Sequence, residues 1–121
     1  VPMKAASISV IIPNYNGKNL LQNNLPSVFA ALEHAAIPYE VLVVDDCSTD
    51  DSWDIIQSLS NDYTWIKCYR NDKNIGVINC MNKALSLSTG SLFYGTASDD
   101  IISNKSFEII IPVPVIKVLN I

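Results

Sequence analysis

The stretch Val41-Leu42-Val43-Val44-Asp45-Asp46 joins an apolar strand directly to a pair of carboxylates. A second stretch, residues 92–100, repeats this design and ends in Ser98-Asp99-Asp100. The carboxyl ends of parallel strands form the ligand crevice of an α/β sheet. Four carboxylates gathered at that edge repel one another, so we expect a divalent cation there, together with the phosphate that such a cation usually carries.

The segments around these two stretches predict an alternating fold. Apolar, β-branched runs predict strands at residues 7–13, 39–44, 64–69 and 92–97, and the third is polar enough to lie near an edge. Apolar residues at helical spacing predict a helix in each of the three intervals between these strands. The order β-α-β-α-β-α-β with short connections indicates an α/β fold with a mostly parallel, doubly wound sheet.

Individual residues refine the expected helices. Pro26 falls inside the first helical pattern, which predicts a kink or a restart with Pro26 in the first turn. His34 is expected at the end of that helix, and Asp50 or a neighbouring hydroxyl is expected to cap the second helix. In the third helix we expect one buried face, made of Val77, Met81, Ala84 and Leu85.

Composition narrows the possible partners and compartments. The chain of 121 residues is long enough for one domain, and a net charge of −4 without a basic run argues against a nucleic-acid partner. The three cysteines are odd in number and fit no disulfide or zinc spacing, which favours a reduced, cytoplasmic setting. No run of 18 apolar residues occurs, so we expect no membrane span.

Four motifs, in order, resemble the family 2 glycosyltransferases of the GT-A fold. Residues 9–16, which read Ser-Val-Ile-Ile-Pro-Asn-Tyr-Asn, are similar to the opening strand of that family, and residues 39–50 are similar to its second signature. Asn74-Ile75-Gly76, with Asn82-Lys83-Ala84 and Thr89-Gly90, resembles the helix before the metal motif. Ser98-Asp99-Asp100 falls where those enzymes carry a DxD-type motif.

This resemblance implies that the chain binds a nucleoside-diphosphate sugar, with a UDP-sugar expected, and a divalent metal, Mn or Mg. Asp46 would accept a hydrogen bond from the base, Asp99 would face the ribose or the sugar, and Asp100 would bind the metal that bridges the phosphates. Asp45 would be mostly structural. The remaining residues expected to line the nucleotide are Pro13, Asn14 and Tyr15 near the base and ribose, and Asn74, Gly76 and Asn82 near the ribose and diphosphate.

Two departures from the family pattern bear on catalysis. Ala97 stands where many members carry the first aspartate of the metal motif. Residues 1–102 correspond to the donor-binding half, whereas residues 103–121 form a short extension in which Glu108 is the single acid. The acceptor half and its catalytic base are therefore not evident, although a saccharide or lipid-linked acceptor and an inverting transfer are what the resemblance implies.

Two alternatives remain. The chain is either an active transferase or an inactive fragment that binds nucleotide or self-associates through its apolar residues 109–116. A phospho-receiver domain also gathers aspartates at strand ends, but its acidic pair should follow the first strand, which here runs into Pro13-Asn14-Tyr15. For the glycosyltransferase we expect a location in the cytoplasm, including the inner face of the membrane.

Overall fold

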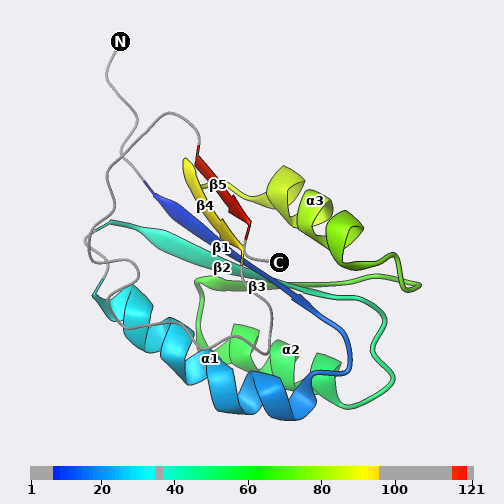
Figure 1. Ribbon diagram of the computed structural model, residues 1–121. Helices are drawn as coiled ribbons and strands as arrows, with labels where there is room; N and C mark the ends of the chain where they lie inside the picture. The colour runs from blue at the N-terminus through cyan, green and yellow to red at the C-terminus, as the bar shows by residue number, and fades with distance from the viewer. Residues whose placement is uncertain (1–6, 35–36, 96–115, 120–121) are drawn as a thin grey trace.

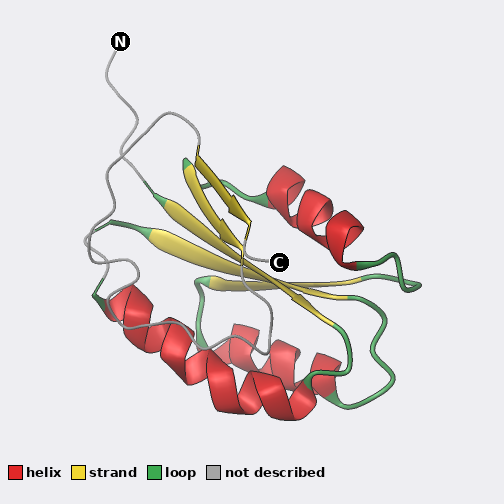
Figure 2. Cartoon of the chain, viewed as in Figure 1, coloured by secondary structure: helices red, strands yellow, loops and turns green. Residues whose placement is uncertain are grey.

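Parallel strands flanked by helices make up the part of the chain that the computed structural model describes, residues 7–34, 37–95 and 116–119 (Figures 1 and 2). The strands lie in the order β3-β2-β1-β4-β5, and every neighbouring pair is parallel. The expected α/β doubly wound sheet is therefore confirmed. The strands are β1 (Ile8–Asn14), β2 (Tyr39–Asp45), β3 (Ile66–Arg70), β4 (Leu92–Gly95) and β5 (Ile116–Leu119), and the helices are α1 (Lys18–Glu33), α2 (Ser52–Asp62) and α3 (Val77–Leu87).

The helices divide between the two faces of the sheet, with α1 and α2 on one face and α3 on the other (Figure 1). The larger core joins alternate residues of β1 and β2, such as Val10 and Val41, to the apolar faces of α1 and α2. The smaller core joins Ile11 and Val44 to α3. Successive strand residues point to opposite faces, so neighbours in sequence belong to different layers.

The first helix differs from its prediction at the proline. Helix α1 runs from Lys18 to Glu33 with Pro26 inside it, so a restart at Pro26 is wrong. Leu21 and Leu25 before the proline and Val28 after it are all buried against the same core. Packing along one continuous face thus outweighs the hydrogen bond that Pro26 cannot donate. His34 is the C-terminal cap residue, as expected.

The other predicted elements agree with the sequence to within one or two residues, whereas β5 was not among the four predicted strands. Strand β3 begins at Ile66 rather than at residue 64, and it is the outer strand beside β2, as predicted. Val77 is 44% exposed, so its expected place on the buried face of α3 is wrong. It is the first helical residue, and the buried face begins one turn later with Cys80, Met81 and Ala84.

A buried carboxylate ties the strands together at their amino ends. Glu40 accepts hydrogen bonds from Ser9 Oγ at 2.8 Å, from Lys67 Nζ at 2.9 Å and from the backbone N–H and hydroxyl of Thr89 at 2.8 and 2.6 Å. Burial opposes the charge of Glu40, but these donors prevail and lower its pKa to about 2. One side chain of β2 therefore links β1, β3 and the segment that leads into β4.

Candidate functional site

The two aspartates at the carboxyl end of β2 point to opposite sides of the sheet. Asp45 is the last residue of β2 and lies in register with Asn14 of β1. By strand alternation Asp45 faces the α1–α2 layer, and Asp46 faces the α3 layer together with Val44 and Cys80. The pair is thus not one four-oxygen site, and each carboxylate has its own set of partners.

Asp46 is held as an ionised acceptor by the loop that precedes α3. Its Oδ1 accepts the backbone N–H of Ile75 at 2.8 Å and Nδ2 of Asn71 at 3.0 Å, and its Oδ2 accepts the N–H of Gly76 at 2.9 Å. Burial alone would raise the pKa of Asp46, but these hydrogen bonds outweigh burial and lower it. A carboxylate only 4% exposed therefore keeps its charge at the carboxyl end of the sheet.

Gly76 makes this arrangement possible through its backbone conformation. Its φ is +87°, in the region that residues with a Cβ rarely adopt, whereas a Cβ there would meet no atom within 4 Å. The requirement for glycine is therefore conformational rather than steric. This turn aims the Gly76 N–H at Asp46, and the same N–H also lies 3.2 Å from Oδ1 of Asn74.

Two further residues of this cluster were not predicted from the sequence. Asn71, which follows β3 and is 5% exposed, places its amide between Asp46 and Lys83, whose Nζ lies 2.6 Å from Asn71 Oδ1. Side chains on a helix lean toward its N-terminus, so Lys83 reaches back from the second turn of α3 to the carboxyl edge. Lys83 belonged to one of the motifs, but nothing in the sequence showed that it would contact Asn71.

Cys80 lies in the same buried cluster and is not reactive. Its sulfur is 3.4 Å from Asn71 Nδ2, and the residue is 0% exposed. Burial, followed by the negative charge of Asp46, raises the pKa of the Cys80 thiol to about 11. A protonated, buried thiol is a packing group and not a nucleophile at neutral pH.

On the other face, Asp45 organises the loop after β2. Its Oδ1 accepts Asn14 Nδ2 at 3.0 Å and Ser48 Oγ at 2.6 Å, and its Oδ2 accepts the Ser48 N–H at 3.0 Å. Arg70 Nε lies 3.7 Å from Asp45 Oδ2, and Arg70 also donates to the carbonyl of Ser48 at 3.1 Å. These contacts agree with a structural role for Asp45.

Asn16 clamps the loop after β1 to the loop after β2. With φ at 51°, it receives the N–H groups of Thr49 and Asp50 on Oδ1 at 2.7 and 3.2 Å, and its own N–H donates to Ser48 Oγ at 2.9 Å. In the sequence, Asn16 appeared only as the last residue of the first motif. The one signal in the sequence was the residue type, because asparagine tolerates the left-handed conformation better than most residues.

The structure places the sequence-predicted residues in three groups. Asp46 and Gly76 are in direct contact, and Asn74 joins them through the Gly76 N–H. Pro13 lies in register with Val44 and shares the α3 side of the sheet with Asp46, while Tyr15 is 52% exposed just beyond the strand. Asn14 is 2% exposed on the opposite face, and no described residue hydrogen-bonds to its Oδ1.

The predicted diphosphate and metal residues are less closely gathered. Asn82 is exposed on α3, next to Lys83. Asp99 and Asp100 lie outside the described residues, as does Ala97. Within the described ranges, no three histidine, cysteine or acidic side chains come together as a metal site.

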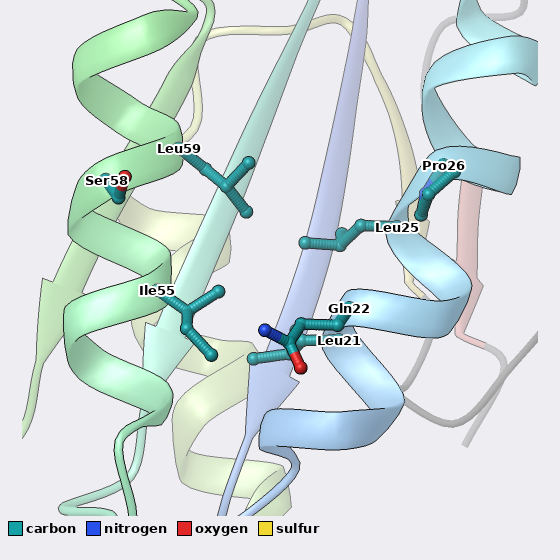
Figure 3. Close-up of a pocket in the computed structure, with 7 residues that line it drawn as sticks. All are labelled: Leu21, Gln22, Leu25, Pro26, Ile55, Ser58 and Leu59. Atoms are coloured by element: carbon teal, nitrogen blue, oxygen red, sulfur yellow. The ribbon is translucent and has the colours of Figure 1, made fainter.

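A groove of about 350 Å³ lies away from this cluster, between α1 and α2. Figure 3 shows Leu21 and Leu25 of α1 pointing toward Ile55 and Leu59 of α2 across it. The groove therefore lies outside the sheet edge where the predicted nucleotide residues gather. Among the described helices, none combines the length and apolar character needed to cross a membrane.

Comparison with curated proteins gives the family context of this geometry. The chain is 33% identical over 93 residues to the putative teichuronic acid biosynthesis glycosyltransferase TuaG of Bacillus subtilis, covering 77% of this chain and 36% of that protein. It is also 33% identical over 93 residues to the UDP-Glc:alpha-D-GlcNAc-diphosphoundecaprenol beta-1,3-glucosyltransferase WfaP of Escherichia coli, covering 77% of this chain and 35% of WfaP.

Solved structures agree with these relatives. TarS residues 1–349 of S. aureus in complex with UDP-GlcNAc matches with a TM-score of 0.70 and 32% identity, covering 83% of this chain and 28% of that one. The mannosyltransferase PcManGT of Pyrobaculum calidifontis, solved with GDP-Man and Mn²⁺, matches with a TM-score of 0.68 and 24% identity, covering 78% of this chain and 28% of that one. Because the identity is low, this match supports the fold alone.

The family profile extends over most of the sequence. The profile described as glycosyl transferase family 2 matches residues 9–113, which include β1 except its first residue, the Asp46 cluster and Asp99 and Asp100. The chain spans about a third or less of the curated relatives named above and of the TarS and PcManGT chains. With the parallel GT-A sheet and a relative bound to UDP-GlcNAc, this match establishes that the chain belongs to glycosyl transferase family 2.

Proposed function

We propose that this chain is the donor-binding part of a glycosyltransferase that uses a UDP-sugar. The enzyme would transfer the sugar, with inversion, to a hydroxyl group of a saccharide or lipid-linked acceptor. The observation that carries the proposal is Asp46, an ionised, nearly buried carboxylate held at the carboxyl end of β2 by three N–H groups. A buried charge is costly unless it is paired, so its retention supports a binding role.

The other predicted residues take roles around this acceptor. Pro13, Asn14 and Tyr15 would line the base and ribose, and Asn74, Gly76 and Asn82 would lie near the ribose and diphosphate. Asp99 would contact the ribose or sugar, and Asp100 would hold a divalent cation. When bound, such a cation offsets the negative charge of the departing diphosphate.

Calorimetric titration of the chain with UDP and Mn²⁺ tests this proposal. We expect metal-dependent binding at millimolar or lower nucleotide, and Asp46→Asn should weaken that binding by about tenfold or more, because a hydrogen bond to a charged acceptor is lost. Asp62→Asn, an exposed change at the end of α2, is the matched control and should bind as the unaltered chain does. No metal-dependent binding at millimolar UDP would overturn the proposal.

Nucleotide binding without transfer is the second candidate for these 121 residues taken alone. It is favoured by the chain's span of only 36% of TuaG and 28% of the TarS structure. Incubation with UDP-GlcNAc, followed by measurement of UDP release, separates the two. Release above the spontaneous rate, lost in Asp100→Asn, would refute the binding-only role.

A further inference from the structure

The hydrogen bonds at Asp46 limit which nucleobase this site can accept. A carboxylate offers about four lone pairs, two on each oxygen. At Asp46, Oδ1 already receives two strong donors, Asn71 Nδ2 and the Ile75 N–H, whereas Oδ2 receives one, the Gly76 N–H. The sulfur of Cys80 lies 3.4 Å from the same Asn71 Nδ2, and a thiol is at most a weak donor to the carboxylate. At most one acceptor position, on Oδ2, is left for a ligand.

The bases differ in what they present to such a position. Uracil offers a single ring N–H between two carbonyl oxygens, whereas guanine offers a ring N–H and an adjacent amino group. Guanine pairs best with a carboxylate whose two oxygens are both available, and cytosine presents a ring nitrogen lone pair that a carboxylate repels. We propose that Asn71, held in place by Lys83, is a specificity residue that occupies Asp46 Oδ1 and so restricts the site to uracil over guanine.

Lys83 sets the direction of the Asn71 amide. Because Lys83 Nζ donates to Asn71 Oδ1 at 2.6 Å, the amide nitrogen is turned toward Asp46 and donates to it at 3.0 Å. Without the lysine, the amide oxygen of a residue only 5% exposed would lose its partner, and the amide would be free to rotate. Rotation would set oxygen against oxygen at Asp46. Lys83 is therefore a positioning residue that acts through Asn71.

This inference rests on the proposed function, and titration of the full chain with UDP and with GDP tests it. We expect UDP to bind about tenfold tighter than GDP, since one guanine donor is left unpaired. Asn71→Leu and Lys83→Met should each lower this ratio severalfold, and Lys83→Arg should preserve it. Lys73→Met removes a nearby exposed charge outside the cluster and should leave the ratio unchanged.

A second readout needs no nucleotide. Titration of the Asp46 carboxyl by ¹³C NMR should show a higher pKa in Lys83→Met and in Asn71→Leu than in Lys73→Met, because the charged form loses a donor. An unchanged pKa overturns the link from Lys83 to Asp46. Equal binding of UDP and GDP by the unaltered chain would overturn the specificity alone. If the chain binds neither nucleotide, the proposed function is overturned, and the specificity with it.

Discussion

At the scale of single residues, Asp45 and Asp46 show how adjacent identical side chains acquire different roles. Asp45 is surrounded by Asn14, Ser48 and Arg70 on the α1–α2 side and is fully buried. Asp46 faces α3, and its Oδ2 receives one backbone or amide N–H donor where Oδ1 receives two. The difference follows from strand alternation alone, because consecutive residues leave a strand on opposite faces.

Gly76→Ala tests the conformation that aims the loop at Asp46. A Cβ at φ +87° costs about 1–2 kcal/mol even though open space surrounds the position. We expect the free energy of unfolding, measured by urea denaturation, to fall by about that amount, and UDP binding to weaken because the Gly76 N–H shifts away from Asp46. Ser86→Ala, on the exposed side of α3, is the control and should change neither quantity. A fully stable Gly76→Ala variant would contradict this reading.

At the scale of elements, one carboxylate joins the start of two helices. Asp50 Oδ1 accepts the N–H of Ser52, the first residue of α2, at 2.9 Å, and Oδ2 accepts the N–H of Lys18, the first residue of α1, at 3.3 Å. These donors outweigh the effect of burial and lower the pKa of Asp50. The N-cap residue of α2 is Asp51, whose side chain makes no capping hydrogen bond, so the expected cap by Asp50 or a neighbouring hydroxyl is not formed at that position. Asp50 lies one residue earlier and instead accepts the N–H of the first residue of each helix.

Asp50→Ala should destabilise the protein by about 1–2 kcal/mol, because two helix N-termini lose a capping acceptor at once. Chemical denaturation monitored by circular dichroism measures this loss. Asp54→Ala is the matched control, since Asp54 is also acidic and lies in the first turn of α2 but is exposed. Equal losses for the two variants would show that charge near the helix, and not the paired hydrogen bonds of Asp50, stabilises these termini.

The sequence predicted elements better than contacts. Periodicity located β1, β2 and all three helices, because the apolar faces that it detects are the ones that pack in the two cores. Val77 was misplaced because periodicity does not show which turn of a helix is the first to be buried. The contacts of Asn71 with Lys83, and separately of Asn16 with Asp50, were missed because the partners lie 12 and 34 positions apart along the chain and are brought together only by the tertiary fold.

At the scale of the whole molecule, the sheet has distinct ends. Glu40 and its donors link the strands at the amino end, and the loops that hold Asp45 and Asp46 gather at the carboxyl end. Ligands of open α/β sheets bind at the carboxyl ends of the strands. The network around Glu40 is therefore a stability feature, separate from the proposed donor site.

The lowered pKa of Glu40 makes the free energy of unfolding depend on pH. Its pKa is about 2 in the folded protein, below the usual value of 4.5, so the stabilisation is complete above about pH 4.5 and is lost as the pH falls toward 2. We expect a loss of about 2 kcal/mol across this range, allowing for solvent around Lys67. Glu40→Gln should remove this part of the pH dependence in urea denaturation, while Glu33→Gln, at an exposed helix position, should retain it. Identical profiles for both variants would contradict this account.

The most direct test of the central claim is a crystal structure of the chain with UDP and Mn²⁺. The account predicts that the ring N–H of uracil lies about 3 Å from Oδ2 of Asp46, with Asn71 Nδ2 still bonded to Oδ1. A uracil ring placed elsewhere, such as in the groove between α1 and α2, or an Asp46 whose open position faces only solvent, would contradict it.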